Sequence, residues 1–162
     1  MSAKVSPIPA GYHTITPYIV VKDTRKAIEF YKRAFGAELR GGIAEGPDGK
    51  VMHAEIKIGD SILMLNDEMP DYKVLAPTST NADTCVSLFL YVENADKVFE
   101  SAKAAGAVVT QPLEDQFWGD RYGKLRDPFG HSWSIATHIK DLTPEQMKAA
   151  MDEAMAKMPT HA

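Results

Sequence analysis

Two side chains that could move protons stand two residues apart in the first half of the chain. His53 and Glu55 occupy alternate positions in the run VMHAEIKI, and alternate residues of a strand share one face. An imidazole held in one tautomer beside a carboxylate can act as a general base. The pair therefore predicts acid–base catalysis. The alternative is an edge strand that faces solvent, because Lys57 continues the same alternation.

A second group of candidate residues lies in the segment DQFWGDRYG. Trp118, next to a glycine, offers a flat ring beside open backbone, and Gln116 adds a polar amide. Arg121 offers a planar fork that fits a carboxylate or a phosphate. We predict that these three side chains contact a ligand. The alternative for Arg121 is a structural ion pair with Asp120 or Asp127.

The elements that must position these residues arise from an internal duplication. PYIVVKDTRKAIEFYKRAF (17–35) aligns with LFLYVENADKVFESAKAA (88–105) at an offset of 71 positions. The same offset places GDSILML (59–65) over GHSWSIA (130–136). Two similar halves predict two copies of one structural unit.

Each half contains the signals of a strand followed by a helix. A run of β-branched and aromatic residues predicts the strand. Asp23 and Asn94 then stand where a helix N-cap is needed, and Gly36 and Gly106 are placed to end each helix in a left-handed conformation. Short strand-like runs follow each helix, so each half reads as βαβββ.

The predicted organisation is an α+β fold within a single domain, residues 1–162. The two βαβββ modules span 13–66 and 85–138. Residues 67–84 are rich in proline, aspartate, asparagine and threonine and form the predicted linker.

The composition changes after the second module. Thr143 begins a T-P-E-Q capping box that predicts a helix over 143–158. Met147, Met151, Met155 and Met158 repeat on one face of this helix. We expect the stripe to pack on the protein's own body or on a partner subunit, since methionine fills irregular apolar contacts. A regulatory or lipid-contacting helix is the alternative.

Composition limits the classes of partner. Of 162 residues, 44% are hydrophobic and 25% are charged, which is typical of a globular protein. The formal net charge of -4 disfavours nucleic-acid binding, and no apolar run is long enough to span a membrane. Cys85 is the single cysteine, and the first residues lack the apolar core of a secretory signal. We therefore expect a cytoplasmic protein that has no nucleic-acid or membrane partner.

The duplicated unit, a V-x-D before the first helix and a W-G-x-R-x-x-x-x-x-D-P-x-G motif resemble the vicinal oxygen chelate superfamily, which includes glyoxalase I, bleomycin-resistance proteins and extradiol dioxygenases. The motif stands here as Trp118, Gly119, Arg121, Asp127, Pro128 and Gly130. The runs PYIVVKD, AIEFYKRAFGAE, MHAEIKIGDSILML and FWGDRYGKLRDPFGHSW are most similar to its PhnB-like branch. The resemblance covers about residues 13–138 and implies a cup of curved mixed sheet and a homodimer. It does not select one activity, because one fold hosts many functions.

The resemblance places the ligands of metal-using relatives on the first and last strand of each module. Counted from the caps and the turn glycines, these positions are Thr16, Leu63, Ser87 and Ser134. A divalent cation needs imidazole or deprotonated donors to offset its dehydration. We therefore expect no metal and no cofactor, and no glyoxalase I or dioxygenase chemistry.

Strand alternation indicates what lines the cup instead. The expected lining residues are Thr16, Tyr18, Leu63, Ser87, Phe89, Tyr91, Ser132 and Ser134. Rings and hydroxyls suit a small, partly apolar organic ligand held by stacking and a few hydrogen bonds. The alternative is that these side chains fill a closed core.

The sequence therefore predicts a resistance-type or sequestering protein that binds a small organic molecule in a metal-free cup. The alternative is a glyoxalase-like lyase or isomerase in which His53 and Glu55 act on an acidic C–H or a carbonyl substrate, with or without a divalent metal. The expected partners are a small molecule and a second copy of the chain.

Overall fold

The computed structural model describes residues 5–80 and 84–157. The first module consists of β1 (Tyr18–Val21), α1 (Thr24–Phe35), β2 (Glu38–Glu45), β3 (Val51–Ile58) and β4 (Ser61–Asp67). The second consists of β5 (Ser87–Tyr91), α2 (Ala95–Ala105), β6 (Val108–Asp115), β7 (Asp120–Arg126) and β8 (Ser132–His138). Short 3-10 helices at Pro70–Tyr72 and Pro77–Ser79 lie in the predicted linker, and α3 (Pro144–Ala156) follows the second module.

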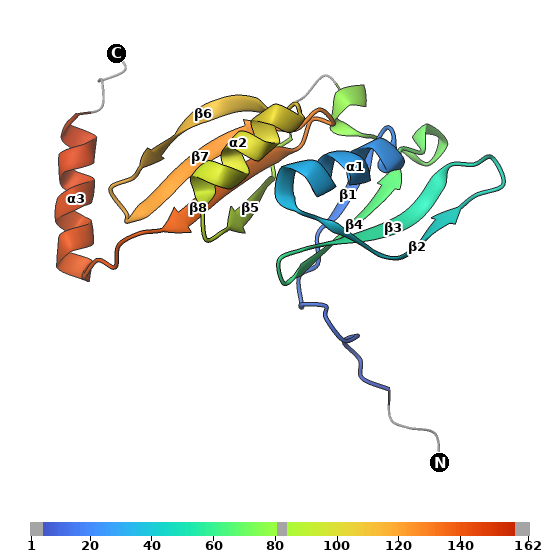
Figure 1. Ribbon diagram of the computed structural model, residues 1–162, viewed down its shortest axis with the longest axis horizontal. Helices are drawn as coiled ribbons and strands as arrows, with labels where there is room; N and C mark the ends of the chain where they lie inside the picture. The colour runs from blue at the N-terminus through green and yellow to red at the C-terminus, as the bar shows by residue number, and fades with distance from the viewer. Residues whose placement is uncertain (1–4, 81–83, 158–162) are drawn as a thin grey trace. The chain divides into compact units, whose positions relative to one another are not determined.

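The two modules have the same sheet topology (Figure 1). The strand order is β1-β4-β3-β2 in the first sheet and β5-β8-β7-β6 in the second. In each sheet the first strand pairs in parallel with the last, and the other pairs are antiparallel. The predicted α+β fold of two βαβββ modules with a C-terminal helix is confirmed.

The predicted helix boundaries of both modules are also confirmed. The side chains of Asp23 and Asn94 each accept a hydrogen bond from the backbone N–H three residues later, at 3.0 and 2.9 Å. Gly36 and Gly106 end α1 and α2 with φ values of 66° and 117°, a conformation that glycine adopts without a Cβ penalty.

The chain divides into two compact units. The first unit contains the described residues before Val86 together with Pro128–His131, the turn between β7 and β8. Phe129 of this turn lies near Phe30 and Tyr31 of α1, with ring centroids 5.9 and 6.1 Å apart. The aromatic core of the first unit is thus completed by a residue from the second half of the sequence.

Each sheet has one face against its own helix and one face away from it, which we call the open face. α1 lies against β3 and β4, and α2 lies against β6, β7 and β8 (Figure 1). The helix face of the first sheet contains Ile56 and Leu65, and that of the second contains Leu125, Trp133 and Ile135, all buried. The apolar cores therefore lie under the helices, and the open faces remain available for a functional site.

The register of β4 corrects the predicted position of Leu63. Tyr18 of β1 pairs with Met64, while Leu63 pairs with Ile56 of β3. Directly paired residues share a face, so Leu63 is buried on the helix face and Met64 lies on the open face with Tyr18.

The cause is a difference in turn length between the modules. The cross-strand pair Glu55–Met64 encloses eight residues, whereas the equivalent pair Lys124–Ser134 encloses nine. Aligning the two turns by their glycines therefore shifts β4 by one residue. Such a shift moves every side chain of a strand to the opposite face.

α3 begins with the predicted capping box. Thr143 and Gln146 exchange hydrogen bonds between side chain and backbone at 2.9 and 3.3 Å. No residue of Pro144–Ala156 is buried, and Met151 and Met155 are exposed, while Met158 lies outside the described residues. Figure 1 shows α3 beyond the ends of β6 and β7.

None of the helices over 5–80 and 84–157 has the length and apolar character to cross a bilayer.

Candidate functional site

Four aromatic rings gather on the open face of the second sheet. Phe89 stacks on Tyr122 with ring centroids 5.6 Å apart and an interplanar angle of 22°. Tyr91 lies 4.9 Å from Phe89, and Trp118 meets Tyr122 edge-on at 5.5 Å. Tyr122 is buried, whereas Phe89 and Tyr91 are 47% and 65% exposed. We call these four residues the ring platform, because their rings form one cluster in which Phe89 and Tyr91 are exposed to solvent.

A row of hydroxyl groups lies beside the ring platform on the same face. Ser87 is hydrogen-bonded to Ser134 at 3.0 Å and accepts from Ser132 at 3.3 Å. Tyr122 is hydrogen-bonded to the same Ser134 oxygen at 3.2 Å. The expected grouping of hydroxyls with Phe89 and Tyr91 on one face is confirmed by the register of β5 and β8.

The carboxylate of Asp120 fixes two of the rings. It is buried, and its Oδ2 accepts hydrogen bonds from the Tyr91 hydroxyl at 2.9 Å and from Trp118 Nε1 at 3.1 Å. Its Oδ1 lies 2.8 Å from His138 Nδ1. Burial disfavours the charged form of Asp120, but the hydrogen bonds from these three side chains outweigh it and lower the pKa of the carboxyl group. Asp120 is therefore an ionised anchor at the edge of the ring platform.

The turn that carries Trp118 is tied to the segment after β8. Gly119 has a φ of 97°, and its carbonyl oxygen accepts the N–H groups of Ile139 and Lys140 at 2.9 and 3.0 Å. A Cβ added at Gly119 would clash with the carbonyl oxygen of Lys140. The glycine of the W-G motif thus permits a close backbone approach that holds the Trp118 ring in place.

Arg121 lies on the opposite face from the ring platform. Its guanidinium donates two hydrogen bonds of 2.7 Å to Asp96 of α2 and one of 2.9 Å to Asp115. The alternation of β7 explains this placement, because Arg121 directly follows Asp120 and so faces the helix. The structural ion pair is therefore the correct interpretation, with Asp96 and Asp115 as partners instead of Asp120 or Asp127.

Three other predicted contact residues point elsewhere. Thr16 precedes β1 and donates its hydroxyl hydrogen bond to the carbonyl oxygen of His13 at 3.0 Å. The Gln116 amide donates to the carbonyl oxygen of Glu114 at 3.3 Å within its own turn. Leu63 is buried on the helix face.

The predicted pair His53 and Glu55 lies on the open face of the first sheet. His53 Nε2 is 3.1 Å from Glu55 Oε1, and the Tyr18 hydroxyl is 3.3 Å from His53 Nδ1. Glu55 also accepts hydrogen bonds from Tyr12 at 2.6 Å and from Arg40 at 3.0 Å. The Tyr12 hydrogen bond is the main cause of the lowered pKa of Glu55; the bonds from His53 and Arg40 add to it, and burial opposes it.

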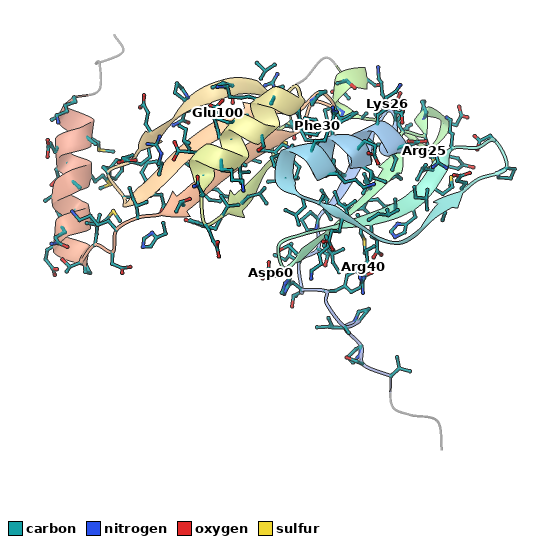
Figure 2. The ribbon with its side chains drawn as sticks, in the orientation of Figure 1. Arg25, Lys26, Phe30, Arg40, Asp60 and Glu100 are labelled. Atoms are coloured by element: carbon teal, nitrogen blue, oxygen red, sulfur yellow. The ribbon has the colours of Figure 1, made fainter. Side chains whose placement is uncertain are left out.

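The N-terminal segment is fastened to this cluster. Arg40 lies beside the N-terminal segment (Figure 2), with the guanidinium carbon 4.7 Å from the centre of the Tyr12 ring and a hydrogen bond of 3.1 Å to the carbonyl oxygen of Ala10. A carboxylate that receives several donors is a weak base. The arrangement around Glu55 therefore suits an anchor for residues 10–12 better than a proton acceptor.

For two residues of these clusters, His138 and Tyr12, no motif in the sequence indicates a bonding partner. His138 shares the alternation of Ser132 and Ser134 along β8, so strand parity is the signal that could have identified it. Tyr12 precedes the first strand and meets Glu55 across 43 positions. No local pattern relates residues at that separation.

The positions that the resemblance assigns to metal ligands do not fit a divalent cation. With the corrected register they carry Thr16, Met64, Ser87 and Ser134, and none supplies an imidazole or a carboxylate. Across 5–80 and 84–157, no three His, Cys, Asp or Glu side chains meet in a group that could hold a metal ion.

Proteins similar to this chain are known from several organisms. An uncharacterised protein of Mycobacterium bovis is 43% identical over 140 residues, which is 85% of this chain and 91% of that protein. The crystal structure of TioX from Micromonospora sp. ML1 is 28% identical with a TM-score of 0.61, covering 78% of this chain and 99% of TioX.

The same fold occurs in a PhnB protein from Bacillus cereus, which is 22% identical with a TM-score of 0.61 over 77% of this chain and 99% of that protein. Residues 11–135 match the model of the glyoxalase/bleomycin resistance protein/dioxygenase superfamily. With its duplicated βαβββ topology and this match over most of its length, the chain belongs to that superfamily.

Proposed function

We propose that the chain binds a small planar organic molecule on the ring platform, in a resistance-type or sequestering role that uses no metal. The observation that carries this proposal is the exposed aromatic surface formed by Phe89 and Tyr91 over the buried Tyr122. Aromatic surface in contact with water is stabilised when a second ring stacks on it. The exposed Ser87 and the half-buried Ser132 beside the rings offer hydrogen bonds to polar substituents of such a ligand.

The two tryptophans of the chain supply a direct test. Trp118 belongs to the ring platform, whereas Trp133 is buried on the helix face. In a titration with 4-nitrobenzamide followed by two-dimensional ¹H–¹⁵N NMR, we expect the indole N–H signal of Trp118 to move and that of Trp133 to stay. Replacing Phe89 with alanine should weaken binding roughly tenfold, because it removes the stacking surface.

The matched control is Tyr72→Ala, which removes an exposed ring outside the two sheets. This variant should bind the amide as the wild type does. Equal movement of both indole signals, or unchanged binding by Phe89→Ala, would place the ligand elsewhere and reject the proposal.

An acid–base enzyme is the second candidate, and the 3.1 Å contact between His53 and Glu55 favours it. In that role His53 would take a proton from an acidic C–H group while Glu55 fixes its tautomer. The bonds from Tyr12 and Arg40 to the same carboxylate favour the anchoring role instead. We therefore rank ligand binding first.

We also propose that two copies of the chain associate through α3. Met151 and Met155 of this helix are exposed, and the helix carries both acidic and basic side chains, so its surface can face a second copy of itself. Sedimentation velocity should show a dimer for the wild type and a monomer for the double variant Met151→Lys, Met155→Lys. Ala149→Lys on the opposite side of α3 should stay dimeric. A monomeric wild type, or a double variant that stays dimeric, contradicts the proposal.

A further inference from the structure

The imidazole of His138 stands between two carboxylates at the edge of the ring platform. Its Nδ1 is 2.8 Å from the buried Asp120, which also holds Tyr91 and Trp118. Its Nε2 is 3.1 Å from Asp141, which follows β8. Nδ1 is therefore bonded to a buried carboxylate, and Nε2 is bonded to an exposed one.

The charge state of His138 follows from these neighbours. The hydrogen bond with Asp120 is the larger cause and the contact with Asp141 the smaller cause of a raised pKa for the imidazole. An imidazolium has an N–H on both nitrogens. With Nδ1–H directed to Asp120, the Nε2–H is a charged donor beside the ring platform.

The carboxylate of Asp141 occupies the position at His138 Nε2 that a ligand carboxylate would take. Its side chain is fully exposed, so replacing it by another carboxylate uncovers no buried surface. A ligand carboxylate on His138 Nε2 would form the same charge-assisted hydrogen bond. The geometry of an anion contact is therefore already present in the free protein.

Apart from His138, the charged groups around this edge are balanced: three are cations, Lys124, Arg126 and Lys140, and three are anions, Glu114, Asp120 and Asp141. Lys124 and Arg126 continue the open face of β7, Glu114 of β6 pairs with Tyr122, and Lys140 lies beside Asp141 in the chain. Tyr91 and Tyr122 are the remaining titratable groups; the Tyr91 hydroxyl is bonded to Asp120 and the Tyr122 hydroxyl to Ser134. The preference for an anion then depends on the hydrogen bond from His138 Nε2–H more than on the summed charge of the surrounding side chains.

We propose that the ring platform recognises planar organic acids, with the ring stacked on Phe89 and Tyr91 and the carboxylate bonded to His138 Nε2. This inference rests on the proposed ligand-binding function and adds the chemical class of the ligand. It makes His138 a binding residue, and it makes Asp120 the positioning residue that orients the imidazole.

The test compares 4-nitrobenzoate with 4-nitrobenzamide, which share a ring and differ in charge. At pH 6 we expect the acid to bind roughly tenfold more tightly than the amide, as a charge-assisted hydrogen bond allows. The acid should lose this advantage as the pH rises through the raised pKa of His138, because the imidazolium is then deprotonated. Affinities are read from the Trp118 indole signal.

Two variants make the result specific. His138→Gln should bind both probes equally at every pH, and an unmoved Trp133 signal shows that its core is intact. Asp141→Asn removes the internal competitor and should strengthen binding of the acid two- to threefold without changing the amide. If acid and amide bind equally to the wild type, the proposed recognition of the carboxylate by His138 is wrong, while ligand binding on the ring platform remains supported. If neither probe moves the Trp118 signal, both fall.

Discussion

Replacing Trp133 with alanine is expected to lower the free energy of unfolding by about 3–5 kcal/mol, the cost of deleting a large buried aromatic side chain. Trp133 is 1% exposed on the helix face of the second sheet. Its Nε1 donates a hydrogen bond of 2.8 Å to the buried carboxylate of Asp127. The substitution therefore removes a ring from the core under α2 and one donor from a buried charge. Urea unfolding followed by far-ultraviolet circular dichroism measures the loss.

The second tryptophan is the matched control for this prediction. Trp118 is half-buried on the open face, so Trp118→Ala should cost only about 1–2 kcal/mol, from the edge contact with Tyr122 and the bond to Asp120. An equal or larger loss for Trp118→Ala would contradict the assignment of the two faces. If Trp133→Ala does not fold, Ile135→Val in the same core should still cost about 0.5–1.5 kcal/mol.

Local signals made most of the fold predictable. Asp23, Asn94, Gly36 and Gly106 define both module helices because a helix end needs a side-chain acceptor or a left-handed residue at a fixed position. The capping box at Thr143 works in the same way. Each signal depends on residues within one or two turns of backbone, and so the sequence carries it directly.

Strand faces were predictable only where the register was known. Phe89, Tyr91 and Ser134 lie together as expected because their strands were counted from reliable landmarks. Leu63 is on the other face because one turn is a residue shorter, and Arg121 because β7 begins at Asp120, so that the two residues alternate between the faces. Alternation has a period of two, so an error of one residue inverts the prediction completely.

Contacts across long separations were not predictable from spacing. His138 is joined to Asp120 across 18 positions and Tyr12 to Glu55 across 43. The sheet order brings the first pair together, and an irregular segment before β1 brings the second. Both depend on tertiary structure, and for this reason the sequence indicates for Asp120 only a polar contact in its own segment or an ion pair with Arg121.

Replacing Glu55 with glutamine is expected to lower the free energy of unfolding at pH 7 by about 1.5–3 kcal/mol, the range for hydrogen bonds to a charged group. The uncharged amide retains the shape of the side chain but is a weaker acceptor for Tyr12, Arg40 and His53. Because Tyr12 belongs to the N-terminal segment, chymotrypsin should also cleave after it about tenfold faster, in keeping with a loss of about 1.4 kcal/mol in local stability.

The pH dependence separates this ionic anchor from a simple packing effect. The pKa of Glu55 is lowered in the folded chain, so its contribution is complete above the unfolded value of about 4.3 and disappears as the pH falls through the folded value. The stability difference between wild type and Glu55→Gln should therefore be large at pH 7 and shrink below about pH 4. Glu38→Gln, an exposed change on neighbouring β2, should show neither the loss nor the faster cleavage. If the stability difference between wild type and Glu55→Gln is the same at low pH, the charge of the Glu55 carboxylate does not hold the N-terminal segment. The catalytic interpretation of Glu55 would then be favoured again.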